Sequence, residues 1–154
     1  VIARYTAMDG EDAFMSGLLH RIGFAVGLKK ITSKSDDNHT FWEALELTHT
    51  VFGKMTLHEW GMPEHIQEVV AHYGQTIINN EVNLYSSAIL VAEELAKRFR
   101  FEFRRPNKGK DSAVRELSDT AQRAISVLEI DEGLMRKIYT DAHFVLGHGL
   151  RLNL

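Results

Sequence analysis

The sequence contains no cysteine, and this absence removes several classes of chemistry at once. Disulfide bonds, thiolate metal sites and cysteine nucleophiles are all excluded. A chain of 154 residues without cysteine fits a reducing compartment, so we expect a cytoplasmic protein.

Long hydrophobic runs are also missing. The longest apolar stretches, such as residues 88–92, are far shorter than the roughly 20 residues that cross a bilayer. The first residues carry no signal-peptide pattern, so we expect no membrane association. Because the chain begins with Val1 rather than methionine, we expect that further residues precede it in the natural protein.

The charge is nearly balanced, with 18 Lys and Arg residues against 21 Asp and Glu residues and a net charge of -3. This balance gives no overall attraction for nucleic acid or an anionic surface, so any such binding would have to be local. The sequence also has no Gly-rich phosphate loop and no nucleophile elbow of a Ser-His-Asp hydrolase.

Apolar residues recur at helical spacing along almost the whole chain, and this period predicts an all-α helical bundle. The length is that of one ordinary domain. The predicted helices cover residues 11–28, 40–60, 64–73, 81–99, 112–128 and 132–146.

Several residues have predicted places in these helices. The buried stripe of the first helix should contain Phe14, Leu18, Ile22 and Ala25, and that of the fourth Leu84, Ala88, Val91, Leu95 and Phe99. We expect Trp60 in the core, Gly61 in a left-handed conformation after a helix, Asn79 and Asn80 as turn and cap residues, and Asp131 as an N-cap.

Eight histidines in a chain without cysteine raise the hypothesis of a metal site, because neutral imidazole binds zinc, iron and other transition metals. His20, His49 and His72 lie on or beside the apolar stripes of separate helices and could converge inside a bundle. Glu93 could complete the set. The other histidines are interpreted as surface or hydrogen-bonded core residues.

Four segments resemble motifs of the HDOD family, a branch of the HD superfamily, in their order and spacing. They are Gly-Leu-Leu-His-Arg-Ile-Gly at 17–23, Thr-His-Thr-Val-Phe-Gly at 48–53, Trp-Gly-Met-Pro-Glu at 60–64 with Ala-His-Tyr at 71–73, and Val-Ala-Glu-Glu-Leu-Ala at 91–96. The resemblance spans about residues 12–99. It implies the helical fold of HD domains, with residues 1–154 as a single HDOD-like domain closed by residues 100–154.

The same resemblance implies which residues a metal would use. HD-superfamily hydrolases hold metal ions with histidines and a His-Asp doublet and activate water for attack on phosphate esters. Here Arg21 replaces the doublet aspartate. At about 4 Å from a divalent ion its charge would cost on the order of 8 kcal/mol at an effective dielectric constant near 20.

The main expectation is that the protein binds no cofactor. The alternative is a reduced metal site, in which iron, manganese or zinc is bound by His20, His49, His72 and Glu93. Arg21 could instead bind an anion or carboxylate. Tyr73 stands where a histidine often follows the His72 position in the family.

A second candidate site is a basic stretch that interleaves with phenylalanines. Basic and aromatic side chains together can bind phosphates and stack on bases. We interpret this stretch as a solvated helix end and loop, because it matches no defined nucleic-acid module. Its basic residues are Arg98, Arg100, Arg104, Arg105, Lys108 and Lys110.

The sequence thus predicts a non-catalytic regulatory module of bacterial signal transduction that binds another protein, a second copy of itself or a small anionic ligand. Two alternatives remain open at this point. One is a metal-dependent phosphohydrolase with the reduced site, and the other is nucleotide or nucleic-acid binding through residues 98–110.

Overall fold

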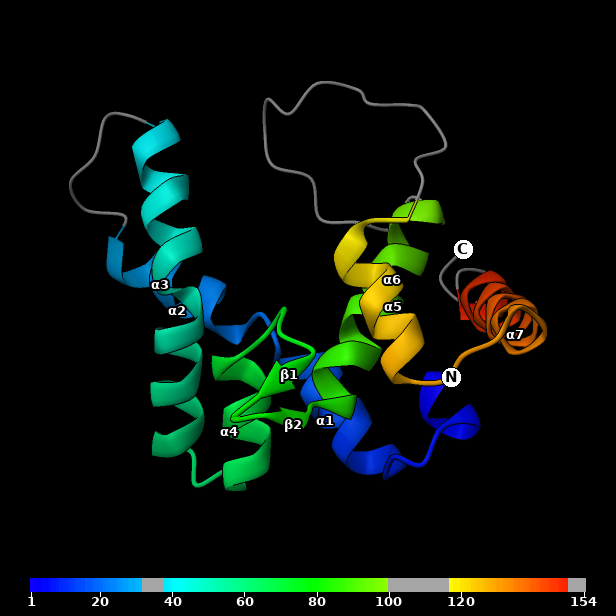
Figure 1. The fold of residues 1–154 in the computed structure, drawn as a ribbon. Helices are drawn as coiled ribbons and strands as arrows, with labels where there is room; N and C mark the ends of the chain where they lie inside the picture. The colour runs from blue at the N-terminus through cyan, green and yellow to red at the C-terminus, as the bar shows by residue number, and fades with distance from the viewer. Residues whose placement is uncertain (32–37, 100–116, 150–154) are drawn as a thin grey trace.

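The computed structural model describes residues 1–31, 38–99 and 117–149, and within them the fold is all-α, as the sequence predicts (Figure 1). The elements are the 3-10 helix η1 (Ile2–Tyr5), α1 (Gly10–Leu19), α2 (Ile22–Ile31), α3 (Asn38–Glu59), α4 (Glu64–Ala71), a hairpin of β1 (Ile77–Ile78) and β2 (Glu81–Val82), α5 (Leu84–Arg98), α6 (Asp119–Val127) and α7 (Glu132–Gly149).

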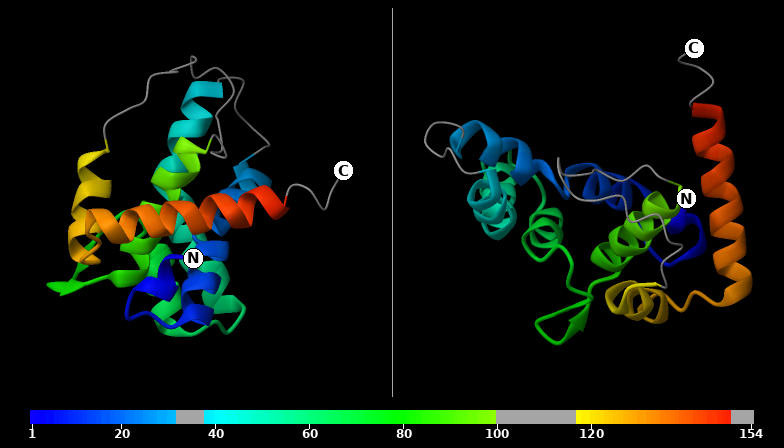
Figure 2. Two further views of the ribbon diagram at one scale, coloured as in Figure 1. Left: turned by 90° about the vertical axis from the view of Figure 1, so that its right-hand side faces the viewer. Right: turned by 90° about the horizontal axis from the view of Figure 1, so that it is seen from above.

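The helices form two halves, which Figures 1 and 2 show on either side of α1. In one half, α2 packs on α3 and α3 on α4; in the other, α5 packs on α6, with η1 between α5 and α7. Each half has its own hydrophobic cluster. Leu57 and Val70 are fully buried in the first, and Ala124 and Ile138 in the second.

Helix α1 bridges the two halves, because it contacts both α4 and α5. It begins cleanly at Asp9, whose carboxylate accepts hydrogen bonds from the backbone amides of Glu11 and Asp12. Its Leu19 belongs to the cluster of α3 and α4. The junction between the halves therefore lies along α1 and at the corner where α1 turns into α2.

Helices α2 and α3 approach closely at Gly23. A Cβ atom there would lie 1.7 Å from the backbone oxygen of His49, so no other residue fits without moving one helix. This contact places the start of α2 directly against the middle of α3.

The predicted helix over residues 11–28 is wrong in one respect that matters for the site. The helix is interrupted at His20 and Arg21, so that α1 ends before these residues and α2 starts after them in a new direction. The buried stripe does not continue across this break: Phe14 and Leu18 are 66% and 63% exposed, while Ser16 and Leu19 are buried.

Two other local predictions are also wrong. Trp60 is 58% exposed rather than in the core, because α3 ends at the residue before it. For residues 79 and 80 the predicted turn is confirmed, because they form the turn of the hairpin with φ angles of 51° and 65°. The predicted cap is wrong, since the cap of α5 is Asn83.

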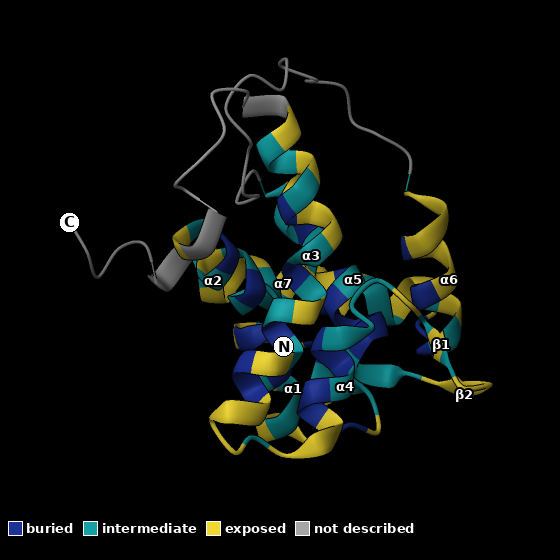
Figure 3. Ribbon diagram, turned by 90° about the vertical axis from the view of Figure 1, so that its left-hand side faces the viewer, coloured by how far each residue is buried: buried dark blue, intermediate teal, exposed yellow. Residues whose placement is uncertain are grey.

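Other predictions are confirmed. Gly61 has a positive φ of 68°, and Asp131 Oδ1 accepts a hydrogen bond from the amide of Leu134 at 2.7 Å. On α5, the residues Ala88, Val91 and Leu95 are buried, as the helical stripe predicts (Figure 3).

Residues 112–116 of one predicted helix lie outside the described residues, and α6 covers only the later part of that prediction. None of the helices in the described parts of the chain combines the length and the apolar character that a membrane span requires.

Candidate functional site

The His20-Arg21 doublet lies at the corner between α1 and α2, and its side chains meet residues from two other segments. Tyr73 follows the end of α4, and Glu93 is on α5. Because α1 lies between the two halves, this corner brings together groups that are 72 residues apart in sequence.

Glu93 is the centre of the cluster. Its Oε1 accepts hydrogen bonds from Nε and Nη2 of Arg21 at 3.1 and 2.5 Å, and its Oε2 accepts one from the hydroxyl of Tyr73 at 2.6 Å. Nη2 of Arg21 also lies 3.4 Å from the Tyr73 hydroxyl. Both carboxylate oxygens are therefore occupied by donors of this chain.

The charges of these groups follow from that geometry. Burial alone would raise the pKa of Glu93, but the contacts with His20 and Tyr73 and the charge of Arg21 outweigh it and lower this pKa to about 2. Burial and the bond to Glu93 raise the pKa of Tyr73 to about 12. The cluster is thus a paired carboxylate and guanidinium with a neutral phenol.

Two imidazoles border this cluster, and both are held in the same way. Nδ1 of His20 lies 2.6 Å from the carbonyl oxygen of Gly17, and Nδ1 of His49 lies 2.7 Å from that of Glu46. A carbonyl can only accept, so each Nδ1 donates its proton there. Nε2 of His49 then presents a lone pair when that ring is neutral, whereas Nε2 of His20 faces Oε1 of Glu93. Both Nε2 atoms are buried, and within the residues that the structure describes neither makes a hydrogen bond.

The surroundings of His49 favour its neutral form. The side chain stacks on Phe24, with ring centroids 4.1 Å apart, and contacts Tyr73 edge-on at 5.9 Å. Burial and the nearby charge of Arg21 lower the pKa of His49. His20 Nε2 lies 3.5 Å from Glu93 Oε1, the nearest approach of an imidazole to the carboxylate.

His72 lies apart from the other predicted ligands. Its Nε2 is 3.1 Å from Oε2 of Glu68, which is in turn bonded to Lys54 at 2.5 Å, and its side chain is 35% exposed. Tyr73, the next residue, takes its place beside Glu93. Sequence reasoning also missed Phe24, for which only its helical spacing of four residues from His20 gave a signal.

The donors of this cluster do not fit a divalent metal ion as they stand. The carboxylate of Glu93 is already bonded to Arg21 and Tyr73, and the guanidinium charge would repel a cation. In the residues that the structure describes, no three His, Asp or Glu side chains are grouped as metal ligands.

The basic stretch is described only at its first residue. Arg98 is exposed at the end of α5, with its Nε 3.9 Å from Oε1 of Glu94. Arg100, Arg104, Arg105, Lys108 and Lys110 lie outside the described residues.

A comparison of the sequence with models of protein families shows which family the segment that contains this corner matches. The HDOD domain model matches residues 1–76, which include His20, Arg21, His49 and Tyr73. Residues 1–76 belong to the HDOD domain family. This domain is therefore a module related to the HD superfamily, while Glu93 lies beyond the matched residues and reaches the site only through the fold.

No curated protein and no solved structure matched the chain.

Proposed function

We propose that this HDOD domain is a non-catalytic regulatory module that acts by binding another protein chain. The observation that carries the proposal is the bond between Arg21 and Glu93, at 2.5 Å from Nη2 to Oε1. A metal-dependent hydrolase needs an anionic ligand for its ion, and here that anion is neutralised by the chain itself.

An exposed row of apolar side chains on α3 supports the binding role. Leu47, Val51 and Met55 follow one another at a spacing of four residues and are 81%, 57% and 51% exposed. Such contiguous apolar surface is typical of interaction sites. Figure 3 shows exposed residues along this helix.

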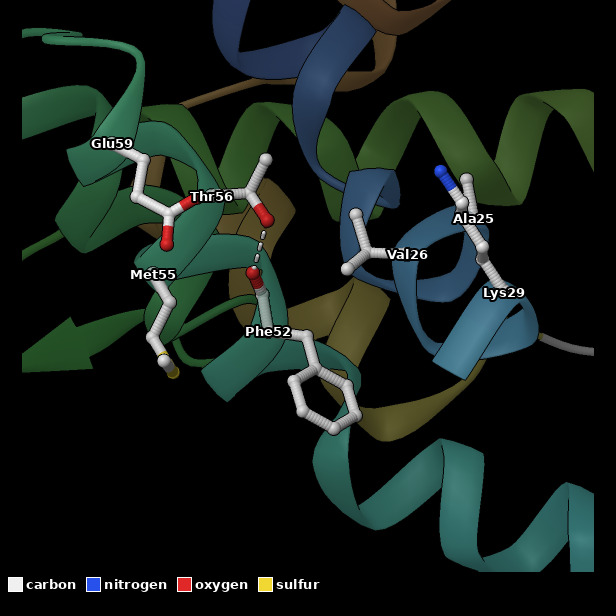
Figure 4. Close-up of a pocket in the computed structure, with 7 residues that line it drawn as sticks. All are labelled: Ala25, Val26, Lys29, Phe52, Met55, Thr56 and Glu59. Carbon is white, nitrogen blue, oxygen red and sulfur yellow. Dashed lines mark hydrogen bonds between the residues drawn. The ribbon is translucent and has the colours of Figure 1, made fainter. Parts of the chain in front are cut away.

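A groove borders the end of this row. It lies between α2 and α3, has a volume of about 510 Å³, and presents mainly apolar side chains with one charge on each helix (Figure 4). A side chain of a partner could enter it beside Met55. Its lining includes Ala25, Val26, Lys29, Phe52, Met55 and Glu59.

The test of the non-catalytic role is a phosphodiester hydrolysis assay with added manganese or ferrous ion. We expect no turnover above that of the His49→Ala variant, because His49 binds no ion that activates water. Turnover by the wild type that disappears in His49→Ala would overturn the proposal.

The second candidate is a metal-dependent phosphohydrolase with a reduced site. The Nδ1 contacts of His20 and His49 with backbone carbonyls favour it, because histidine ligands of metals are oriented in this way, and within the described residues their buried Nε2 atoms make no hydrogen bond. The same assay separates the two candidates.

Self-association is the form of binding that can be measured without knowing a partner. Light scattering over a concentration series should show a dimer that Val51→Lys converts to monomer, because a charge in the exposed row opposes apolar burial. A wild type that stays monomeric at all concentrations would exclude a homo-oligomer and leave a different protein as the partner.

A further inference from the structure

We propose that the exposed row and the groove on α3 bind a second copy of this chain, and that the later part of its helix α7 is the segment that docks there, with Phe144 in the groove. This inference rests on the proposed function, because it names the partner of the surface on α3. It adds a second surface, on α7, which the proposed function does not use.

The later part of α7 presents apolar side chains to solvent. Ile138 is fully buried, but Val145, seven residues later on the same side of the helix, is 48% exposed, and the adjacent Phe144 is 63% exposed. The hydroxyl of Tyr5 donates to Oδ2 of Asp141 at 2.8 Å, which holds α7 against η1 just before this turn. The turn with Phe144 then continues past η1, as the view from above shows (Figure 2).

The groove and this part of α7 lie far apart in one copy. Helices α2 and α3, which form the groove, are at one end of the molecule, and α7 is at the other end (Figures 1 and 2). Helix α7 therefore cannot fill the groove of its own chain. It can enter the groove of a second copy, because its end projects from the body of the domain.

The charges around the exposed row disfavour the simplest alternative, in which two α3 helices pair with each other. Glu43 and Glu59 are exposed and lie one helical turn beyond the two ends of the row. If two rows paired, Glu43 would face Glu43 of the second copy in a parallel arrangement and Glu59 in an antiparallel one. Either arrangement places like charges opposite each other. A docking helix with basic residues avoids this repulsion.

Helix α7 has a basic residue at a matching distance from Phe144. Lys137 is exposed and lies seven residues earlier on the same side of α7, while the exposed Glu46 lies nine residues before Met55 on α3. These separations are about 10 and 13 Å along the helix axes. If α7 lies parallel to α3 with Phe144 beside Met55, Lys137 comes to the level of Glu46 within about 3 Å, which its long side chain spans.

The groove suits an aromatic side chain. Val26 of α2 and Phe52 of α3 line it from two sides, and its volume of about 510 Å³ is typical of sites that take an organic group (Figure 4). Aromatic side chains in such pockets are common centres of binding energy. Two copies related by a twofold axis would make this contact twice, which gives a closed dimer.

Sedimentation velocity over a concentration series tests the role of α7. Phe144→Lys should raise the dissociation constant of the dimer at least about 30-fold, because it removes an aromatic anchor and opposes burial. The matched control is Phe14→Lys on α1, where the side chain is 66% exposed, and it should change the constant by no more than about twofold. Circular dichroism checks that both variants are folded.

Cross-linking tests the contact itself. Because the chain contains no cysteine, a single introduced cysteine reports on one position. Met55→Cys and Phe144→Cys are mixed in equal amounts and oxidised. We expect the disulfide between positions 55 and 144 to form faster than either disulfide between identical chains, because disulfide formation requires Cβ atoms about 4 Å apart. Equal rates, or faster formation of the 55–55 disulfide, would overturn the proposal.

The results also separate this inference from the proposed function. A dimer that Val51→Lys disrupts and Phe144→Lys does not would overturn α7 as the docking segment, and a wild type that stays monomeric would overturn the second copy as the partner. Both results leave the binding role of α3 in place. The proposed function itself fails on a different result, which is metal-dependent turnover in the phosphodiester assay.

Discussion

The two halves of the molecule differ in the interactions that stabilise them. The half around α5, α6 and α7 is closed chiefly by apolar side chains, with Ala124 and Ile138 fully buried. The half around α1 to α4 has a smaller apolar cluster and, at its border with α5, the polar group of Arg21, Tyr73 and Glu93. Burial of carbon stabilises each half, while the packing of α1 on α4 and α5 and the matched charges of Arg21 and Glu93 join them.

The largest expected effect comes from removing buried carbon in the half that carries the site. Leu57→Ala on α3 should lower the free energy of unfolding by about 2–5 kcal/mol, because Leu57 is 0% exposed and the cavity cannot refill. The matched control is Leu47→Ala on the same helix, where the side chain is 81% exposed. Urea unfolding measures both, and equal losses would contradict the placement of the core.

Ile138→Ala in the other half should cost a similar amount and also reports whether the halves unfold together. Both tryptophans of the chain, Trp42 and Trp60, are in or next to α3, so fluorescence follows one half while circular dichroism follows all helices. We expect the two transitions of this variant to coincide, because α1 and the Arg21 cluster join the halves. Separate transitions would show that the junction is weaker than its geometry indicates.

Gly23→Ala should cost about 1–3 kcal/mol or more, because its methyl group would lie 1.7 Å from the backbone oxygen of His49. Gly17→Ala is the control, since a Cβ at this position in α1 meets nothing within 4 Å. This control should stabilise by about 0.5–1 kcal/mol through helix propensity. Thermal unfolding compares the two, and a neutral Gly23→Ala would contradict the close approach of α2 and α3.

The charge pair predicts a specific dependence on pH. The folded-state pKa of Glu93 is about 2 against an ordinary value of 4.5, so its contribution is complete above about pH 5 and is lost as the pH falls from 4.5 toward 2. His20 and Tyr73 also lower this pKa, so Arg21→Gln should remove only the part of the contribution that Arg21 supplies, about 1–3 kcal/mol at neutral pH. Urea unfolding at several pH values should show the wild type and the variant converging in acid, and a constant difference would contradict the pairing.

The smallest effect is expected from the partly exposed ion pairs near His72. Lys54→Ala should cost about 0–1 kcal/mol, because the bond of Lys54 to Glu68 joins two partly exposed side chains. The pair should weaken further in high salt. A loss as large as that of Arg21→Gln would mean that the group around His72, rather than the one around Glu93, is the important polar cluster.

The fold class and two helix ends could be predicted from the sequence because these depend on local spacing, whereas the cap of α5, Asn83, was missed. Asp131 and Gly61 take their predicted roles, and the stripe of α5 is buried. The break at His20 was also missed, because apolar residues continue on both sides of that corner and nothing in the local pattern marks a change of direction.

In the candidate site, too, some features could be predicted from local spacing and others depend on tertiary packing. His20, His49 and Glu93 could be selected from their helical positions, but the bond from Arg21 to Glu93 joins residues 72 apart and depends on how α1 meets α5. His72 and Tyr73 are neighbours in sequence, and only the turn that ends α4 decides which of them contacts Glu93. Such choices are made by tertiary packing rather than by spacing.

The most direct test of the central claim is a crystal of the protein soaked in manganese chloride, with anomalous scattering recorded from the ion. We predict that the guanidinium of Arg21 stays bonded to Glu93 and that no anomalous peak lies between His20 and His49. A peak at that position, with Arg21 turned away from Glu93, would contradict the account.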